Sequence, residues 1–263
     1  MALGWKQSSS DADWREVWEH ISSSPDRERA RWLVGTAAGA LQDVLKGTTV
    51  YAWSGGKDSL ALQAVAQAAG VADCFLVTTP LEWPSFNQYV AEHAPHDLTV
   101  VKRSGVNHAW LRENPHMIFP ATSDRASQWF KIVQHTGQRS YCKANGVEHL
   151  LLGRRRADGN YLGLDLGGGV YGYKDRDGFQ RVCPIAEWSH EDVLTVIAAY
   201  GFALPPIYDH PDGFRQGTGP WAAHRYATPG EGWDTTYKID PTVVQRAAEH
   251  RVPGAAEYLE RRQ

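Results

Sequence analysis

Cysteine is scarce in this sequence, and the three thiols, Cys74, Cys142 and Cys183, lie far apart with no CxxC pair. That spacing argues against a disulfide scaffold, a zinc site or an iron–sulfur site held by the protein alone. The eleven histidines are scattered as well, without a neighbouring set of carboxylates. We therefore expect no metal site built from a cluster of side chains, no Fe–S cluster, and a reducing compartment.

Long apolar runs are also lacking. No stretch approaches the ~18 consecutive apolar residues of a membrane span, and the N-terminus has no apolar core of a signal peptide. We expect a cytoplasmic protein with no membrane partner. The formal net charge is −3, so the global charge does not indicate nucleic acid as a partner, although a local basic patch stays compatible with it. A homo-oligomer is equally compatible with the sequence.

Two well-known phosphate-binding motifs are missing. GxxxxGK[ST] would need glycine at position 51 and a hydroxyl after the lysine, but the chain has Tyr51 and Asp58 there, and GxGxxG does not occur. What is present is Ser-Gly-Gly-Lys-Asp-Ser at 54–59, between a β-branched and aromatic run at 48–53 and an Ala- and Leu-rich run at 60–69. These runs predict a strand, a tight loop and a helix that ends at Gly70.

The loop between that strand and helix has the chemistry of a phosphate cradle. Glycines let the backbone approach an anion, and amides at a helix N-terminus point toward it with the helix dipole behind them. Lys57 adds a positive charge, and two serines can donate hydrogen bonds to phosphate oxygens. Asp58 would either cap first-turn amides or hold Mg²⁺ between phosphate oxygens. The candidate nucleotide-binding residues of the loop are Ser54, Gly55, Gly56, Lys57, Asp58 and Ser59.

This loop resembles the PP-loop of the ATP pyrophosphatases, also called adenine nucleotide α-hydrolase-like proteins. The resemblance implies ATP and Mg²⁺ as ligands, with the loop gripping the β,γ-pyrophosphate while ATP is split to AMP and pyrophosphate. The alternative is a Gly-Gly turn with solvated charges. Because Lys57 is expected on an exposed loop, its replacement by alanine should cost within about 0.5 kcal/mol of stability.

The rest of the chain predicts an α/β fold. Apolar runs alternate with helical patterns, which is typical of a parallel sheet with right-handed crossovers and ligands beyond the carboxyl ends of the strands. We expect a three-layer sandwich, in which an open, mostly parallel twisted sheet is flanked by helices, plus a small irregular C-terminal region. The expected division is an N-terminal helical segment at 1–47, the nucleotide-binding domain at 48–200, and an extension at 201–263 that completes the substrate pocket.

Individual elements follow from local patterns. Strands are expected at 74–79, 98–102 and 148–152, a hairpin at 170–174 and 179–182, and helices at 11–21, 25–46, 85–94, 123–135 and 189–200. The glycine-rich stretch 160–169 is expected to be too flexible for a packed strand, and it could be a mobile lid or a plain linker.

The segment after the second expected strand resembles the D-T-G-x-E-x-P-like segment of the phosphoadenosine-phosphosulfate reductase branch of PP-loop proteins. Thr79, Glu82 and Pro84 match that pattern, whereas Thr78 and Pro80 replace its acid and its glycine. The resemblance implies that Thr79 contacts the nucleotide and Glu82 the substrate. A proline-bounded loop with no ligand is the alternative.

Two further segments resemble substrate-contacting elements of that branch. Arg139, Cys142 and Lys143 resemble an Arg-x-x-Cys-x-x-x-Lys element with altered spacing, which implies two bases that neutralise an acidic substrate and a thiolate activated by them. A buried, inert cysteine beside two solvated bases is the favoured alternative for Cys142.

In the second of these segments, Gly153, Arg155 and Asp158 resemble the G-x-R-x-x-E/D segment. This resemblance implies a nucleotide contact for Gly153 and substrate contacts for Arg155 and Asp158. The alternative is a solvated basic loop.

The C-terminal part carries the frame of the branch but lacks its cysteines. The stretch 181–193 resembles R-x-x-P-[IL]-x-x-W-[ST]-x-x-D-V, and residues 208–221 resemble Y-D-x-G-[FY]-x-R-x-G-C-x-P-C with Arg215 as a substrate-binding candidate. Thr218 and Trp221 stand where the two cysteines would be. Thiols that would hold an Fe–S cluster or reduce a sulfonucleotide are therefore missing at these positions.

Three functions are compatible with these motifs. The preferred one is an ATP pyrophosphatase that adenylates an unidentified acceptor and releases pyrophosphate, with Lys57, Asp58 and Arg155 as the catalytic candidates. The second is a sulfonucleotide reductase-like or sulfur-transfer enzyme, which the missing cysteines oppose. The third is a non-catalytic nucleotide-binding protein.

Overall fold

A computed structural model describes residue 3 and residues 9–262 of the chain. Its centre is a seven-stranded sheet in the order β3-β2-β1-β4-β7-β6-β5. The first five strands in that order are mutually parallel, while β6 runs antiparallel to both β7 and β5. The strands are β1 Thr49–Ala52, β2 Cys74–Thr78, β3 Leu98–Lys102, β4 His149–Leu151, β5 Leu164–Gly167, β6 Val170–Lys174 and β7 Gln180–Cys183.

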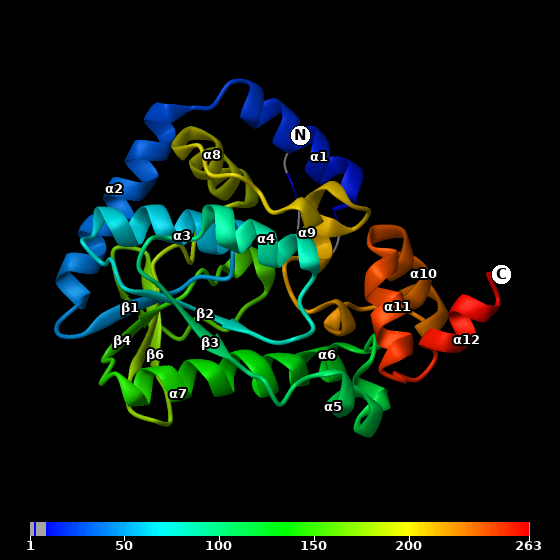
Figure 1. The fold of residues 1–263 in the computed structure, drawn as a ribbon. Coiled ribbons are helices and arrows are strands. Elements are labelled where there is room, and N and C mark those ends of the chain that lie inside the picture. Colours follow the sequence, from blue (N-terminus) through cyan, green and yellow to red (C-terminus); the bar gives the residue numbers. More distant parts are fainter. Residues whose placement is uncertain (1–2, 4–8, 263) are drawn as a thin grey trace.

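Helices cover both faces of this sheet, so the predicted three-layer α/β sandwich is confirmed (Figure 1). One face carries α1 Asp11–Ser23, α2 Arg27–Val44, α3 Lys57–Ala68, α4 Pro84–His93 and α8 His190–Tyr200. The other carries α5 His108–Glu113, α6 Ser123–Trp129 and α7 Thr136–Ala144. This division follows from right-handed crossovers, because the chain moves from β1 to β3 in one direction and then returns to β4.

The C-terminal extension lies at one end of the sandwich (Figure 1). It contains a short helix α9 Gly213–Gln216 and a group of three packed helices, α10 Pro229–Ile239, α11 Pro241–Glu249 and α12 Ala255–Glu260. Trp221, which stands in place of a cysteine of the family pattern, is buried here against Phe119 and Trp233. A large apolar ring thus fills the place where a thiol would lie.

The helix expected to begin at residue 25 instead begins at Arg27, with the side chain of Asp26 as its N-cap. Other helix ends agree with the local signals in the sequence. Ser189 and Asp192 form the capping box at the start of α8, and Gly201 ends that helix with a φ of 72°, as expected from the sequence. A second capping box, between Ser10 and Asp13, begins α1. No helix among the described residues is long and apolar enough to cross a membrane.

Two expectations need correction. The glycine-rich stretch was expected to form no packed strand, yet Leu164–Gly167 forms β5 and pairs with β6. Its glycines allow close backbone contact, since a Cβ on Gly163 would lie 2.1 Å from the carbonyl oxygen of Gly172. The helix expected at 123–135 is in fact interrupted by a π-helix at Phe130–His135, which continues directly into α7.

Candidate functional site

The centre of the sheet contains a topological switch point. β1 lies between β2 and β4, both parallel to it, and the chain leaves β1 toward β2 on one side and reaches β4 later on the other. In open α/β sheets, such a switch point forms the crevice in which ligands bind, beyond the carboxyl ends of the strands. The loop 53–56 follows β1, and the segment 152–158 follows β4, so both predicted phosphate-site segments lie at the end of the sheet where such a crevice is expected.

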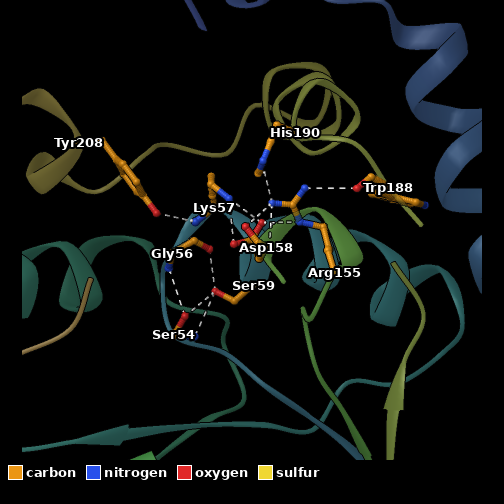
Figure 2. A network of polar contacts seen from close by, with 10 residues as sticks. Ser54, Gly56, Lys57, Ser59, Arg155, Asp158, Trp188, His190 and Tyr208 are labelled. Atoms are coloured by element: carbon orange, nitrogen blue, oxygen red, sulfur yellow. Dashed lines mark hydrogen bonds and ion pairs between the residues drawn. The ribbon is translucent and has the colours of Figure 1, made fainter. Parts of the chain in front are cut away.

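The Ser-Gly-Gly-Lys-Asp-Ser loop is held closed by its two serines (Figure 2). The Ser59 hydroxyl accepts the backbone N–H of Ser54 at 3.1 Å and donates to the carbonyl oxygen of Gly56 at 2.8 Å. Gly55 adopts a φ of +68°, which is the left-handed region that favours glycine. The loop therefore places the N-terminus of α3 at the carboxyl end of β1, as the sequence predicts.

Gly153 brings the two strand ends into contact. A Cβ at this position would lie 2.7 Å from the backbone oxygen of Asp58, so only glycine lets the end of β4 approach the first turn of α3 this closely. A packing requirement therefore accounts for the Gly153 of the motif, and its predicted nucleotide contact stays a prediction.

We expect Gly153→Ala to lower the free energy of unfolding by about 1–3 kcal/mol, because the added methyl group meets backbone rather than a flexible side chain. Gly35→Ala is the matched control: it lies inside α2 with nothing within 4 Å of the added Cβ, and it should stabilise the protein by up to about 1 kcal/mol. Urea unfolding of both variants measures the difference. Equal stabilities would contradict the close approach of these two segments.

The sequence predicts an exposed loop position for Lys57, and this prediction is wrong. Lys57 is the first residue of α3, and its side chain is only 1 % exposed. Its ammonium lies 2.8 and 2.9 Å from the two oxygens of Asp58 and 5.2 Å from the centre of the Trp14 ring of α1. A buried ammonium needs such partners to offset its desolvation. The expected stability cost of Lys57→Ala, within about 0.5 kcal/mol, is therefore too small.

Arg155 is fully buried and connects the two strand ends (Figure 2). Its Nε donates to Asp58 Oδ1 at 2.9 Å, and its Nη2 lies 3.0 Å from Asp158 Oδ2. Further contacts reach the Trp188 carbonyl oxygen and the His190 ring at the start of α8. Asp58 thus holds the ammonium of Lys57 and the guanidinium of Arg155 side by side at the N-terminus of α3.

The C-terminal extension contributes two residues that were not among the site residues expected from the sequence. The Tyr208 hydroxyl accepts the backbone N–H of Lys57 at 3.0 Å, and the Thr218 hydroxyl donates to the Ser54 carbonyl oxygen at 3.0 Å. Both contacts belong to the family-like frame at 208–221, which could have drawn attention to them. His190 and Trp14 gave no such signal, because they reach the site only through the packing of α8 and α1.

Thr79 and Glu82 lie together in the loop that follows β2. The carboxylate of Glu82 accepts both the backbone N–H and the hydroxyl of Thr79, each at 3.0 Å. Burial raises the pKa of Glu82 to about 7, although these hydrogen bonds lower it. Thr79 and Glu82 therefore hold each other in this loop, and their predicted ligand contacts stay predictions.

The raised pKa of Glu82 predicts a pH dependence. The folded state binds this proton more tightly than the unfolded chain, so the stabilisation is complete below about pH 4.5 and is lost as the pH rises through about 7. Glu82→Gln lacks this titration, and its stability relative to the original protein should rise by about 3 kcal/mol between pH 4.5 and 7. Unfolding in urea across pH 4.5–8 tests this, with Glu113→Gln on the exposed end of α5 as control. A difference that does not change with pH would contradict it.

Arg139, Cys142 and Lys143 lie on α7, outside this cluster. Arg139 forms ion pairs with Asp175 and Asp177 in the turn between β6 and β7. This turn precedes β7, which is parallel to β4, so it lies at the amino ends of the parallel strands, whereas the 54–59 loop lies at their carboxyl ends. Lys143 is exposed at the end of the helix. Burial raises the pKa of the Cys142 thiol to about 12, so at neutral pH it is a protonated core residue. The structure does not bring these three to the loop.

Arg215 is also separate from the cluster, on the short helix α9, where its guanidinium pairs with Asp212 at 3.1 Å. Among the residues that the structure describes, no group of three or more histidines, cysteines or acids is arranged to hold a metal ion. The acids nearest the loop, Asp58 and Asp158, are instead joined through Arg155.

The family model for the phosphoadenosine phosphosulfate reductase domain matches residues 48–216, which is more than half of the chain. The chain belongs to this family. The match begins at the predicted first strand and ends at residue 216, just before Thr218 and Trp221, the positions where the two cysteines of the pattern are replaced. Comparison with curated proteins gave no match.

Among solved structures, phosphoadenylyl-sulfate reductase from Candida auris, in a phosphate complex, is similar at 17% identity and a TM-score of 0.47, over 73% of this chain and 89% of that one. The U34-tRNA thiolase NcsA from Methanococcus maripaludis is similar at 16% identity and a TM-score of 0.43, over 93% of this chain and 80% of that one. NMN synthetase from Francisella tularensis is similar at 12% identity and a TM-score of 0.41, over 89% of this chain and 92% of that one.

Proposed function

We propose that this protein is a PP-loop ATP pyrophosphatase, which binds ATP at the 54–59 loop and adenylates an acceptor with release of pyrophosphate. One observation carries the proposal: the N-terminus of α3, Lys57 and Arg155 converge at the crevice between the ends of β1 and β4. A helix N-terminus with two buried cations beside it is suited to a polyphosphate.

The hydrogen bonds of the loop support an anion at this place. The Tyr208 hydroxyl oxygen already accepts the amide of Lys57, so an oxygen acceptor is accommodated at the helix N-terminus. A phosphate oxygen would bind in the same manner, with Ser54 and Thr218 close to it. Gly56 keeps the backbone accessible, since a Cβ there would lie 3.2 Å from the Thr218 hydroxyl.

Charge balance decides what must accompany the nucleotide. Lys57 and Arg155 are matched by Asp58 and Asp158, so these four side chains contribute no net positive charge. A triphosphate would therefore need a further cation, and Mg²⁺ held mainly by phosphate oxygens, with the partly exposed Asp58 as the protein ligand, fits this requirement. When bound, Mg²⁺ would neutralise charge on the phosphate oxygens.

The proposed reaction forms one bond and breaks one. An oxygen of the acceptor attacks the α-phosphorus, while the bond from that phosphorus to the bridging oxygen breaks and its electron pair leaves with pyrophosphate. Lys57 and Arg155, fixed side by side by Asp58, would stabilise the charge that develops on the leaving oxygens. Asp158 and His190 would act on the reaction by positioning Arg155.

The alternative of a thiol-dependent sulfonucleotide reductase has less support. All three cysteines are buried, and burial raises the pKa of Cys142 to about 12 and that of Cys183 to about 11. Thiolates at neutral pH are therefore scarce, and Thr218 and Trp221 supply none. A non-catalytic nucleotide-binding protein would use the same loop and differs only in leaving ATP intact.

Incubation with α-labelled ATP, Mg²⁺ and fractionated metabolites or RNA tests the proposal. Formation of labelled AMP or adenylated product with equimolar pyrophosphate is the expected result. Tight ATP binding with no turnover in any fraction would favour the non-catalytic alternative. Absence of ATP binding would contradict both. Activity that depends on an added dithiol and disappears in Cys142→Ser would favour the reductase.

A further inference from the structure

Aromatic side chains form a second surface next to the proposed phosphate site. We call it the aromatic strip and define it by Phe130, His135, Arg154, Tyr173 and Tyr161. Phe130 is 61 % and Tyr161 is 69 % exposed, although large hydrophobic side chains usually pack inside. Their neighbours connect them: the rings of Phe130 and His135 are 6.4 Å apart, and those of Tyr161 and Tyr173 are 5.1 Å apart.

Arg154 joins the two halves of the strip. Its Nη2 lies 3.1 Å from the His135 ring nitrogen, and its Nη1 donates to the Tyr173 hydroxyl at 2.8 Å. Burial, together with neighbouring arginines, lowers the pKa of His135 to about 4, so the imidazole is neutral and can accept this hydrogen bond. The strip therefore carries the full positive charge of the guanidinium.

That charge is not matched by an acid. Arg155 pairs with Asp58 and Asp158, and Arg156 pairs with Glu187, whereas no carboxylate among the described residues forms an ion pair with Arg154. A guanidinium beside exposed aromatic rings attracts an anionic ligand that also has a planar face. This combination disfavours a purely apolar partner.

The π-helix explains how the strip is assembled. In a regular α-helix, residues five apart point about 140° away from each other, because each residue turns the chain by about 100°. Phe130 and His135 are the first and last residues of the π-helix, whose wider turn brings residues five apart to the same side. Such wide turns are rare and often occur at functional sites.

The strip and the phosphate site share the end of β4. Arg155 has extended backbone, with φ −133° and ψ 153°, so consecutive side chains there point to opposite sides. Arg155 points to the α3 and α8 side and Arg154 to the side of the π-helix. A ligand on the strip would therefore lie next to the crevice without occupying the phosphate loop.

We propose that the aromatic strip stacks a nucleobase of the acceptor, with Arg154 attracting its phosphate. This inference rests on the proposed function for the identity of the ligand as an acceptor, but binding to the strip can be measured without turnover. Aromatic rings stack on bases of any sequence, and arginine adds stacking and charge. The base could belong to a single-stranded nucleic acid or to a free nucleotide.

Fluorescence anisotropy of a labelled single-stranded RNA of mixed sequence tests the inference, with a non-hydrolysable ATP analogue present at saturation to occupy the loop. Tyr161→Ala and Phe130→Ala should each weaken binding by about ten- to a hundredfold, and Tyr161→Phe should retain it. Trp32→Ala is the matched control. Trp32 is also exposed and has an arginine 4.7 Å from its ring centre, but it lies on α2, so this variant should bind as the original protein does.

Competition between the labelled RNA and free nucleotides shows whether the strip binds a free nucleotide or a nucleic-acid strand. Displacement of the RNA by millimolar nucleoside monophosphates assigns the strip to a free nucleotide, and resistance to them assigns it to a strand. Failure of both ligands to bind the original protein, or equal losses in Tyr161→Ala and Trp32→Ala, would overturn the inference. Binding of the ATP analogue, measured in parallel, decides the proposed function separately, because a protein can bind the analogue and still leave the strip empty.

Discussion

Lys57→Met should reduce kcat/KM for AMP and pyrophosphate formation by about 100- to 1,000-fold, which is the usual cost of removing one donor that stabilises a developing charge. Methionine keeps the length of the side chain and its contact with Trp14 but removes the ammonium, which is buried beside Asp58. The pairing of Asp58 with Arg155 survives the change. We therefore expect a modest loss of stability, about 1–3 kcal/mol, instead of unfolding.

A control variant and single-turnover kinetics show whether the loss of turnover comes from the missing ammonium. Lys46→Met removes an exposed lysine just before β1, at the end of this strand opposite to the 54–59 loop, and should leave turnover and stability unchanged. Single-turnover experiments with saturating ATP then separate weaker binding from slower chemistry. Turnover of Lys57→Met equal to that of Lys46→Met would remove the ammonium from the mechanism.

The central strands and the 54–59 loop were predictable because their signals are local. A β-branched run, two glycines and a helix-forming run follow one another within 48–69, and each alone favours the structure that is found. The capping box at Ser189 and Asp192 is equally local. The parallel order of the strands followed from their alternation with helices.

The burial of Lys57 was not predictable in this way. It depends on α1, which lies more than thirty residues earlier in the chain and places Trp14 against the ammonium. A lysine between a glycine and an aspartate favours an exposed loop when only neighbours in sequence are considered. Tertiary packing decides otherwise.

Spacing alone also could not place Arg139, Cys142 and Lys143. The resemblance aligned them with a substrate-contacting element, but α7 covers the other face of the sheet. Asp175 binds Arg139 at the amino ends of the parallel strands, away from the 54–59 loop at their carboxyl ends. By contrast, Arg155 and Asp158 follow a strand directly, and a residue just beyond the carboxyl end of a parallel strand lies at the crevice. The position just beyond a strand end therefore predicted which residues lie near the 54–59 loop, and their roles toward a ligand stay predictions.

Arg155→Met should have the largest combined effect of any single change at the site. The guanidinium is fully buried and contacts two carboxylates, a carbonyl oxygen and an imidazole, so its loss leaves Asp58 and Asp158 without their shared partner. Breaking such a buried network usually costs about 3–5 kcal/mol. Arg155→Lys should recover little of the lost stability, because a single ammonium cannot reach all the partners to which the N–H groups of the planar guanidinium point in different directions.

A second substitution distinguishes the electrostatic role of Arg155 from simple loss of packing. Asp58 keeps its ion pair with Lys57 in Arg155→Met, whereas the carboxylate of Asp158 loses its ion-pair partner. Adding Asp158→Asn removes that charge, so part of the lost stability should return, while turnover should stay at least 1,000-fold low because the guanidinium is still absent. Asp158→Asn alone leaves Arg155 paired with Asp58 and serves as the reference for the cycle. If the double variant were no more stable than Arg155→Met, the carboxylates would not be the source of the instability. If it regained turnover, the guanidinium would have no part in stabilising the leaving group.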